Sequence, residues 1–196
     1  MVIVAKRIAV GELVKEMNKP NIITISGKAE SGKDLTATLL KEELEKIGKR
    51  VLIMHYADYV KYVSAKFFGW DGQKDEKGRS ILQYIGTEKA RSVNPNYWVD
   101  TIIEFIKVFG DDFDYILIPD CRFPNEVFRL EAKSLEVTSI HIERLGHENC
   151  LTPEQRLHAS ETAMDSFMFD YSIQAKTGVE NLRKEVVKFI DWEMEI

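Results

Sequence analysis

The sequence predicts an α/β fold, a sandwich in which helices separate about five parallel strands. Two observations lead to this prediction. Short, apolar, mostly β-branched segments alternate along the chain with longer segments whose apolar residues recur at helical spacing. The first short segment, Ile22 to Ile25, runs directly into a glycine-rich loop and then into a helix-forming stretch. Strands separated by helices pair in parallel through right-handed crossovers, so the apolar segments should form one sheet.

The individual elements follow from their patterns. The expected strands lie at 22–25, 51–54, 115–118, 136–143 and 171–175. Helices are expected over 35–47, where Gly48 provides a stop, over most of 58–109 with a polar break at 71–78, and over 182–190. Ligands of parallel sheets bind beyond the carboxyl ends of the strands. This rule places the loops after Ile25, Met54, Ile118 and Ile142 around one site.

Composition limits the class of protein. The 196 residues are 44% hydrophobic and 30% charged, which suits one compact domain with a full core, or one domain with a small lid. No apolar run is long enough to span a membrane, and the first residues do not resemble a secretory signal. Two cysteines indicate no disulfide framework, so a cytoplasmic location is expected. The net charge of −5 argues against a polymeric nucleic-acid partner.

Three regions are expected along the chain. Residues 1–20 are predicted to be an N-terminal helical extension that ends before Pro20, and 21–196 form the main domain. Within it, the polar segment at about 144–161, which contains Pro153, is predicted to be a lid. The pattern leaves the oligomeric state open, a homodimer included.

The loop after the first strand has the spacing of a phosphate-binding loop, Gly27-x4-Gly32-Lys33. Glycines let successive backbone N–H groups point at phosphate oxygens, and the following helix adds its positive N-terminal end. A chance glycine turn is the competing interpretation. The residues predicted to bind the nucleotide cofactor are Gly27, Lys28, Ala29, Glu30, Ser31, Gly32, Lys33, Asp34 and Leu35.

Asp34 stands where Ser or Thr usually contacts Mg²⁺ in such loops. A carboxylate beside phosphates is repulsive unless a divalent cation lies between them, so Asp34 is a candidate metal contact, directly or through water. Thr36 could share that role. Asp120, directly after a buried strand, is the second metal candidate, and Arg122 offers a planar fork for a phosphate oxygen pair. The alternative for this pair is that Asp120 caps the next helix and Arg122 lies on the surface.

Other segments offer contacts for a second, anionic substrate. Asp58 and Lys61 follow the second strand, and Asp58 could equally be a helix N-cap. Arg91 could clamp a monophosphate, whereas Arg79 is a weaker candidate. Trp98 could face the substrate, although buried aromatic residues more often belong to the core.

The lid segment carries two more cations, Arg144 and Arg156. Phosphoryl transfer develops charge that arginines stabilise, and a closing lid excludes water. His158 could instead bond a backbone carbonyl. No His/Cys cluster has zinc-ligand spacing, and no Gly-x-Ser-x-Gly elbow supports a hydrolase triad.

The order of these segments resembles the deoxynucleoside monophosphate kinases of tailed phages and prophages. The resemblance covers about 21–192, and animal phosphomevalonate kinase is a more distant relative with a similar Gly-Lys-Asp loop. The motifs that carry it are Gly27 to Asp34, Tyr56-Ala-Asp58, Gly86-Thr87-Glu88 with Arg91 and Trp98, Asp120-Cys-Arg122-Phe-Pro-Asn-Glu126, and His158-Ala-Ser-Glu161. The chain departs from the pattern at Tyr59, where relatives often have proline, and at 174–178, where an Asn-x-Gly turn is missing.

The resemblance implies a P-loop nucleoside monophosphate kinase-like three-layer sandwich that uses ATP and Mg²⁺ and phosphorylates a deoxynucleoside monophosphate. It also implies roles: Lys33 on the transferring phosphates, Asp34 and Asp120 near the metal, Arg91 and Arg122 on the acceptor phosphate, and Arg144 and Arg156 approaching from the lid. The acceptor region would span about 58–109. Two alternatives stay open: a kinase for another phosphorylated metabolite such as phosphomevalonate, and a nucleotide-binding switch module that transfers nothing.

Overall fold

A computed structural model describes residues 19–73, 75–147 and 149–195. Five strands form one parallel sheet in the order β2-β3-β1-β4-β5. Their bounds are β1 Asn21–Ser26, β2 Val51–Ile53, β3 Tyr115–Ile118, β4 Val137–Leu145 and β5 Tyr171–Lys176. The five predicted parallel strands are therefore confirmed, each within about two residues of its expected bounds.

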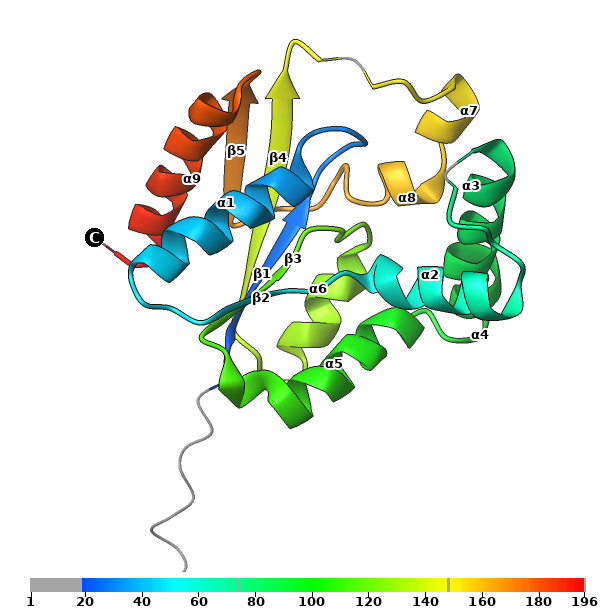
Figure 1. The fold of residues 1–196 in the computed structure, drawn as a ribbon, viewed down its shortest axis with the longest axis horizontal. Helices are drawn as coiled ribbons and strands as arrows, with labels where there is room; N and C mark the ends of the chain where they lie inside the picture. The colour runs from blue at the N-terminus through cyan, green and yellow to red at the C-terminus, as the bar shows by residue number, and fades with distance from the viewer. Residues whose placement is uncertain (1–18, 74, 148, 196) are drawn as a thin grey trace, which may run out of the picture.

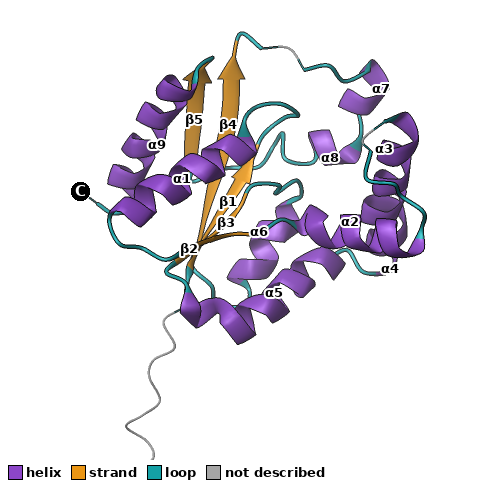
Figure 2. Cartoon of the chain, viewed as in Figure 1, coloured by secondary structure: helices purple, strands orange, loops and turns teal. Residues whose placement is uncertain are grey.

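Helices cover both faces of the sheet, and others, such as α3 and α7, lie away from it (Figures 1 and 2). They are α1 Lys33–Lys46, α2 Tyr56–Phe67, α3 Glu76–Gln83, the π-helical segment η2 Tyr84–Lys89, α4 Ala90–Val93, α5 Tyr97–Phe109, the 3-10 turn η3 Gly110–Asp112, α6 Pro124–Glu131, α7 Pro153–Arg156, α8 Ala159–Thr162 and α9 Val179–Glu193. Figure 1 shows α1 and α9 lying side by side on one face of the sheet, while α5 and α6 cover the other.

Alternation along β1 explains the two-sided core. Successive side chains of a strand point to opposite faces. Ile23 and Ile25 pack into the cluster that includes α1 and α9, whereas Ile22 packs into the cluster that includes α2 and α5. A strand buried on both faces needs a nearly continuous apolar run, and Ile22, Ile23 and Ile25 provide it around the buried Thr24.

The predicted regions map onto the structure as follows. The region 58–109 contains most of α2 and all of α3, η2, α4 and α5, with non-helical backbone at 68–73 between α2 and α3. The segment 144–161 contains the end of β4, all of α7 and the start of α8, and its role as a lid stays a prediction. The predicted N-terminal extension lies, for 1–18, outside the described residues. No helix in the described part of the chain is long and apolar enough to cross a membrane.

Candidate active site

The loop between β1 and α1 has the backbone that its glycines predict. Gly32 has φ 98° and precedes the first residue of α1, Lys33. Gly27 has φ 153°, and a Cβ at this position would lie 2.4 Å from the carbonyl oxygen of Ile142 on β4. Only glycine fits there, because the loop passes directly against the neighbouring strand. The loop is therefore shaped by its packing on the sheet.

Lys33 lies inside this loop. Its Nζ donates hydrogen bonds to the carbonyl oxygens of Gly27 at 2.8 Å and Lys28 at 2.7 Å. The residue is only 9% exposed. Burial, followed by repulsion from the Arg122 guanidinium, lowers the pKa of Lys33 to about 8. The ammonium group is held between the loop and Arg122, where an anion would neutralise both cations.

Asp34 and Thr36, the two candidates for a metal contact on α1, have different surroundings. The Asp34 side chain is 83% exposed, lines the cavity described below, and its Oδ1 lies 3.0 Å from His55 Nε2. Thr36 is fully buried and its hydroxyl donates to the carbonyl oxygen of Gly32. Asp34 is therefore the more accessible oxygen ligand of the two.

No group of three or more His, Cys, Asp or Glu side chains suited to a metal ion occurs among the described residues. Mg²⁺ in phosphoryl-transfer sites is typically held by one or two carboxylates together with substrate phosphates and water. Asp34 fits that pattern, because its carboxylate is open to the cavity on one side of the phosphate loop.

Asp120, at the end of β3, caps a helix that lies far from it in sequence. Its Oδ1 accepts from Tyr56 N at 3.1 Å and its Oδ2 accepts from Ala57 N at 2.8 Å. These are the first backbone donors of α2, which have no partner within their own helix. Burial raises the pKa of the Asp120 carboxyl, and the two N–H donors act against that shift. The alternative that Asp120 caps the next helix along the chain is wrong, because Asp120 caps α2 and the N-cap of α6 is Phe123.

Asp58 is not the cap of α2, so that alternative is also wrong. The N-cap is His55, and Asp58 lies in the first turn. Its carboxylate pairs with Lys61 Nζ at 3.0 Å and with His55 Nδ1 at 3.5 Å. Lys61 lines the cavity, whereas Asp58 is not among its lining residues. A substrate contact by Asp58 therefore stays a prediction without support from this geometry.

Arg91 is fixed by a buried carboxylate that the sequence interpretation left without a role. Arg91 forms an ion pair with Glu126, which is 1% exposed, donates to Pro95 O at 3.1 Å and stacks 4.1 Å above the ring of Phe123. The other Glu126 oxygen accepts from the backbone N–H groups of Arg122 at 2.7 Å and Phe123 at 3.0 Å. Burial raises the pKa of Glu126, and the Arg91 guanidinium opposes this. Glu126 thus fixes both predicted acceptor-side arginines, Arg91 through its side chain and Arg122 through its backbone.

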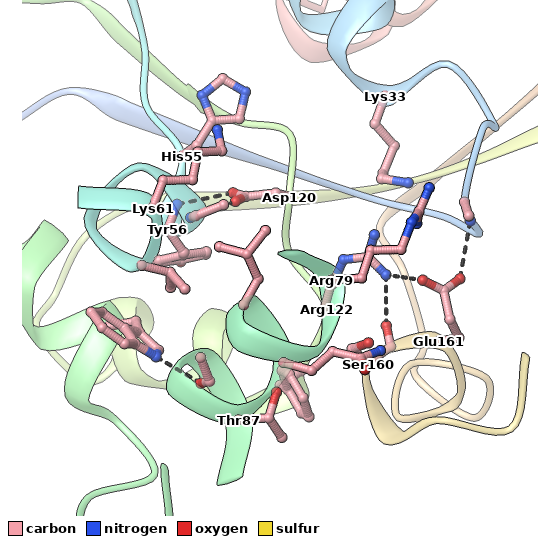
Figure 3. A pocket seen from close by; sticks show the side chains of 18 of the residues that line it. Lys33, His55, Tyr56, Lys61, Arg79, Thr87, Asp120, Arg122, Ser160 and Glu161 are labelled. Carbon is pink, nitrogen blue, oxygen red and sulfur yellow. Dashed lines mark hydrogen bonds and ion pairs between the residues drawn. The ribbon is translucent and has the colours of Figure 1, made fainter. Parts of the chain in front are cut away.

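Arg122 contacts the segment that follows α7. Its Nη1 donates to Ser160 O at 2.9 Å and forms an ion pair with Glu161 Oε1. The second oxygen of Glu161 accepts from Ala29 N, in the phosphate loop, at 3.0 Å. Figure 3 shows this carboxylate between Arg122 and the loop, with Lys33 on the facing side. The sequence placed Glu161 in a motif but assigned it no contact.

These side chains line one cavity of about 480 Å³. One wall is the phosphate loop and the start of α1, the opposite wall is formed by α2, α3 and η2, and 151–161 contributes a third side. The predicted site residues in its lining are Ala29, Glu30, Lys33, Asp34, Lys61, Arg91, Trp98, Asp120 and Arg122. Lining residues that sequence reasoning missed include His55, Gln155, Ser160 and Glu161, while Arg79 lines it as well.

Two predicted lid arginines lie outside that lining. Arg156 folds back on its own loop, where its guanidinium donates to Leu151 O at 3.1 Å and Asn149 O at 2.9 Å. Arg144 Nε donates to Thr177 Oγ1 at 3.4 Å. Trp98 does line the cavity, but it is 3% exposed and its Nε1 donates to Gly86 O at 2.8 Å. Contact of these three side chains with a ligand stays a prediction.

Comparisons with known proteins identify the fold. No family model and no curated protein matches the chain. Shikimate kinase from Aquifex aeolicus is similar with a TM-score of 0.53 and 12% identity, over 88% of this chain and 98% of that chain. The APS kinase CysC from Mycobacterium tuberculosis in complex with AMPPNP and APS is similar with a TM-score of 0.50 and 10% identity, over 88% of this chain and 98% of that chain. The five-stranded parallel sheet and its flanking helices thus share the fold of these two structures.

Proposed function

We propose that this protein is an ATP-dependent kinase that transfers a phosphoryl group to a (deoxy)nucleoside monophosphate and so yields the diphosphate. The observation that carries the proposal is the arrangement of Lys33 and Arg122 in one cavity, where they lie close enough for their charges to act on each other. A donor phosphate on one cation and an acceptor phosphate on the other would meet there.

The donor half consists of the loop 27–34. Its backbone N–H groups and Lys33 hold the outer phosphates of ATP, and Asp34 contacts the Mg²⁺ that accompanies them. When bound, Mg²⁺ would supply neutralisation of the charge between the phosphates, and Asp34 is the residue that would hold it. The acceptor half consists of Lys61 on α2, Arg91 on α4 and Arg122 in the β3–α6 loop, all of which line the cavity.

The chemistry needs positioning and neutralisation of charge. An oxygen of the acceptor monophosphate forms a bond to the γ-phosphorus of ATP, while the bond from that phosphorus to the β,γ-bridging oxygen breaks and ADP leaves with the electron pair. The monophosphate dianion needs no deprotonation at neutral pH, so no general base is required. Holding the two groups in line is the main contribution of the protein.

The choice of a deoxynucleoside monophosphate as acceptor is supported by the order of motifs, which resembles the phage and prophage enzymes. A phosphorylated metabolite such as phosphomevalonate would meet the same arginines. The cavity of about 480 Å³ lies within the range of ordinary small-molecule sites, roughly 300–1,000 Å³.

A coupled assay of ADP formation from Mg-ATP tests the proposal, with each deoxy- and ribonucleoside monophosphate and phosphomevalonate as acceptors. Turnover of at least one nucleoside monophosphate is expected, and Lys33→Ala should lower kcat by about 100-fold or more, since an electrostatic group at the reacting phosphates is lost. Lys46→Ala, on the exposed side of the same helix, is the matched control and should keep wild-type activity.

Each other result has a defined meaning. If phosphomevalonate is the only acceptor turned over, it would replace the nucleoside monophosphate as the proposed substrate. Tight ATP binding without turnover of any acceptor would favour a nucleotide-binding module and refute the kinase. Full activity of Lys33→Ala would show that the loop is not the donor site.

A further inference from the structure

The carboxylate of Glu161 joins two parts of the site that lie far apart in sequence. One oxygen accepts from the backbone of Ala29, in the donor loop, and the other pairs with the guanidinium of Arg122, on the acceptor side. The Glu161 side chain is only 9% exposed, and that of Arg122 is 30% exposed. A side chain fixed at both ends in this way leaves little freedom to the groups that it holds.

The backbone around Glu161 is anchored to the same two parts. Lys28 Nζ donates to the carbonyl oxygen of Glu161 at 2.6 Å and also pairs with Asp165. Arg122 donates to the carbonyl oxygen of Ser160. Glu161 and Arg122 also line a second cavity of about 360 Å³ beyond the loop, so the bridge forms part of the partition between the two spaces. The segment 160–165 thus connects the donor loop to Arg122 through backbone and side-chain contacts.

We propose that Glu161 is a positioning residue that sets the distance and orientation of Arg122 relative to the phosphate loop. The inference rests on the proposed function. With one edge of its guanidinium engaged by Glu161 and Ser160, Arg122 presents its remaining N–H groups in a fixed direction. An acceptor phosphate on those groups is then held in line with the γ-phosphate in the loop. Glu161 makes no contact with the reacting atoms, and its effect on the reaction passes through Arg122.

Glu161 uses one oxygen for each partner, so Glu161→Gln is informative. The glutamine keeps one acceptor oxygen and turns an NH₂ group towards the other donor. Whichever way the amide turns, one of the two contacts breaks and the negative charge that holds Arg122 is lost, while size and shape are kept. Misplacement of a positioning group by about 1 Å can cost about 100-fold in rate, so kcat should fall by roughly 10- to 100-fold.

The experiment measures kcat and both KM values for wild type, Glu161→Gln, Arg122→Ala and the double variant. Glu161→Gln should leave the KM for ATP within about 3-fold of wild type, because Lys33 and the loop amides remain. In the Arg122→Ala background, Glu161→Gln should change kcat by less than about 2-fold, since residues that act through one another are not additive. Glu154→Gln, on exposed α7 in the same segment, is the matched control and should behave as wild type.

Three results would overturn the inference. A KM for ATP that falls several-fold, with kcat unchanged, would mean that the carboxylate occupies a phosphate position and competes with the nucleotide. An equal loss of kcat in both backgrounds would mean that Glu161 does not act through Arg122. Unchanged kinetics would mean that the bridge has no role.

Two further measurements separate these failures from other causes. Thermal unfolding shows whether each variant folds. If Glu161→Gln does not fold, Glu161→Asp replaces it. The aspartate keeps the charge but is too short to reach both partners, so it should also lower kcat. If the proposed function itself is wrong, the wild-type protein will phosphorylate no nucleoside monophosphate, and this result is independent of the Glu161 variants.

Discussion

The carboxylate of Asp120 accepts a hydrogen bond from Ala57 N–H at 2.8 Å, so that the end of β3 caps the start of α2. Asp120 and Ala57 both line the cavity, so this contact closes one part of its wall. It also ties α2, the helix that carries Lys61, to the sheet. The same residue therefore serves the fold whether or not it also contacts a cation through water. Its two roles can be separated by substitution.

Asp120→Ala should destabilise the protein. It removes both hydrogen bonds to the first donors of α2, and the loss of a helix cap costs about 1 kcal/mol, up to roughly 2 kcal/mol. Urea unfolding measures the difference. Asp111→Ala, an exposed aspartate of η3, serves as the control and should change the free energy of unfolding by less than about 0.5 kcal/mol. Equal stability of both variants would contradict the capping role.

Asp120→Asn removes the charge and one of the two acceptor oxygens, and only the loss of the charge makes a difference that depends on pH. Because burial raises the pKa of Asp120 above 3.8, the folded state binds the proton more tightly than the unfolded state. The wild-type carboxyl then contributes stability that is complete below pH 3.8 and is lost as the pH rises through the folded-state pKa. The variant cannot ionise, so its stability relative to wild type should rise with pH across that window. Urea unfolding at a series of pH values measures this, and a relative stability that falls with pH would refute the prediction.

Deprotonation of Lys33 should make the activity fall at alkaline pH. Its pKa of about 8 in the free protein means that the ammonium group loses its proton as the pH rises through that value. The kcat/KM for ATP reports ionisations of the free enzyme and should therefore fall above about pH 8. Bound phosphates favour the charged form, so kcat itself should hold to higher pH. A kcat/KM for ATP that stays constant up to pH 10 would contradict the assignment of this ionisation to Lys33. Lys33→Met gives a further check, because the ATP affinity of that variant should show no fall above about pH 8.

Glu126→Gln should be strongly destabilising. The substitution leaves the guanidinium of Arg91 without its buried partner, and breaking such a pair costs about 3–5 kcal/mol. Chemical unfolding measures the loss, with Glu131→Gln at the exposed end of α6 as the matched control. Adding Arg91→Met should recover part of the loss, because it removes the unpaired charge. No recovery in the double variant would show that Glu126 acts through the 122–123 backbone alone.

Trp98→Phe should lower the stability of the protein and leave the KM for the acceptor largely unchanged. The indole is buried and bonded to the carbonyl oxygen of Gly86, so the smaller ring leaves a void and an unpaired acceptor, with an expected cost of about 2 kcal/mol. Thermal unfolding and the acceptor KM distinguish the roles, with Trp192→Phe as a more exposed control. Unchanged stability with a raised acceptor KM would instead support the direct substrate contact predicted from the sequence.

Local patterns made most of the fold predictable. The strands, α1 and the loop from Gly27 to Lys33 each depend on residues within a few positions of one another, and periodicity and spacing record such relations. One interpretation of Asp120 assumed a helix after it, but no bounds were predicted for α6, because Pro124 at its first position and its short length hide the helical period. The helices α7 and α8, in and next to the segment predicted to be a lid, are shorter still.

The side-chain network of the site was not predictable in the same way. Glu161 meets Ala29 across 132 positions, and Asp120 meets Ala57 across 63 positions. No local pattern records which backbone donor a distant carboxylate will reach. The same reasoning explains the lid arginines: sequence indicated a cation at Arg156, but only the folded loop shows its guanidinium bonded to nearby carbonyl oxygens.

The close approach of Gly27 to Ile142 has a thermodynamic consequence. Because the β1–α1 loop rests on a neighbouring strand, little backbone entropy would be lost if a triphosphate bound there as proposed. Calorimetry should then find that nucleotide binding carries only a small ordering penalty in the loop. Gly27→Ala, forced away from β4, should enlarge that penalty and weaken affinity even though every phosphate-binding donor is still present.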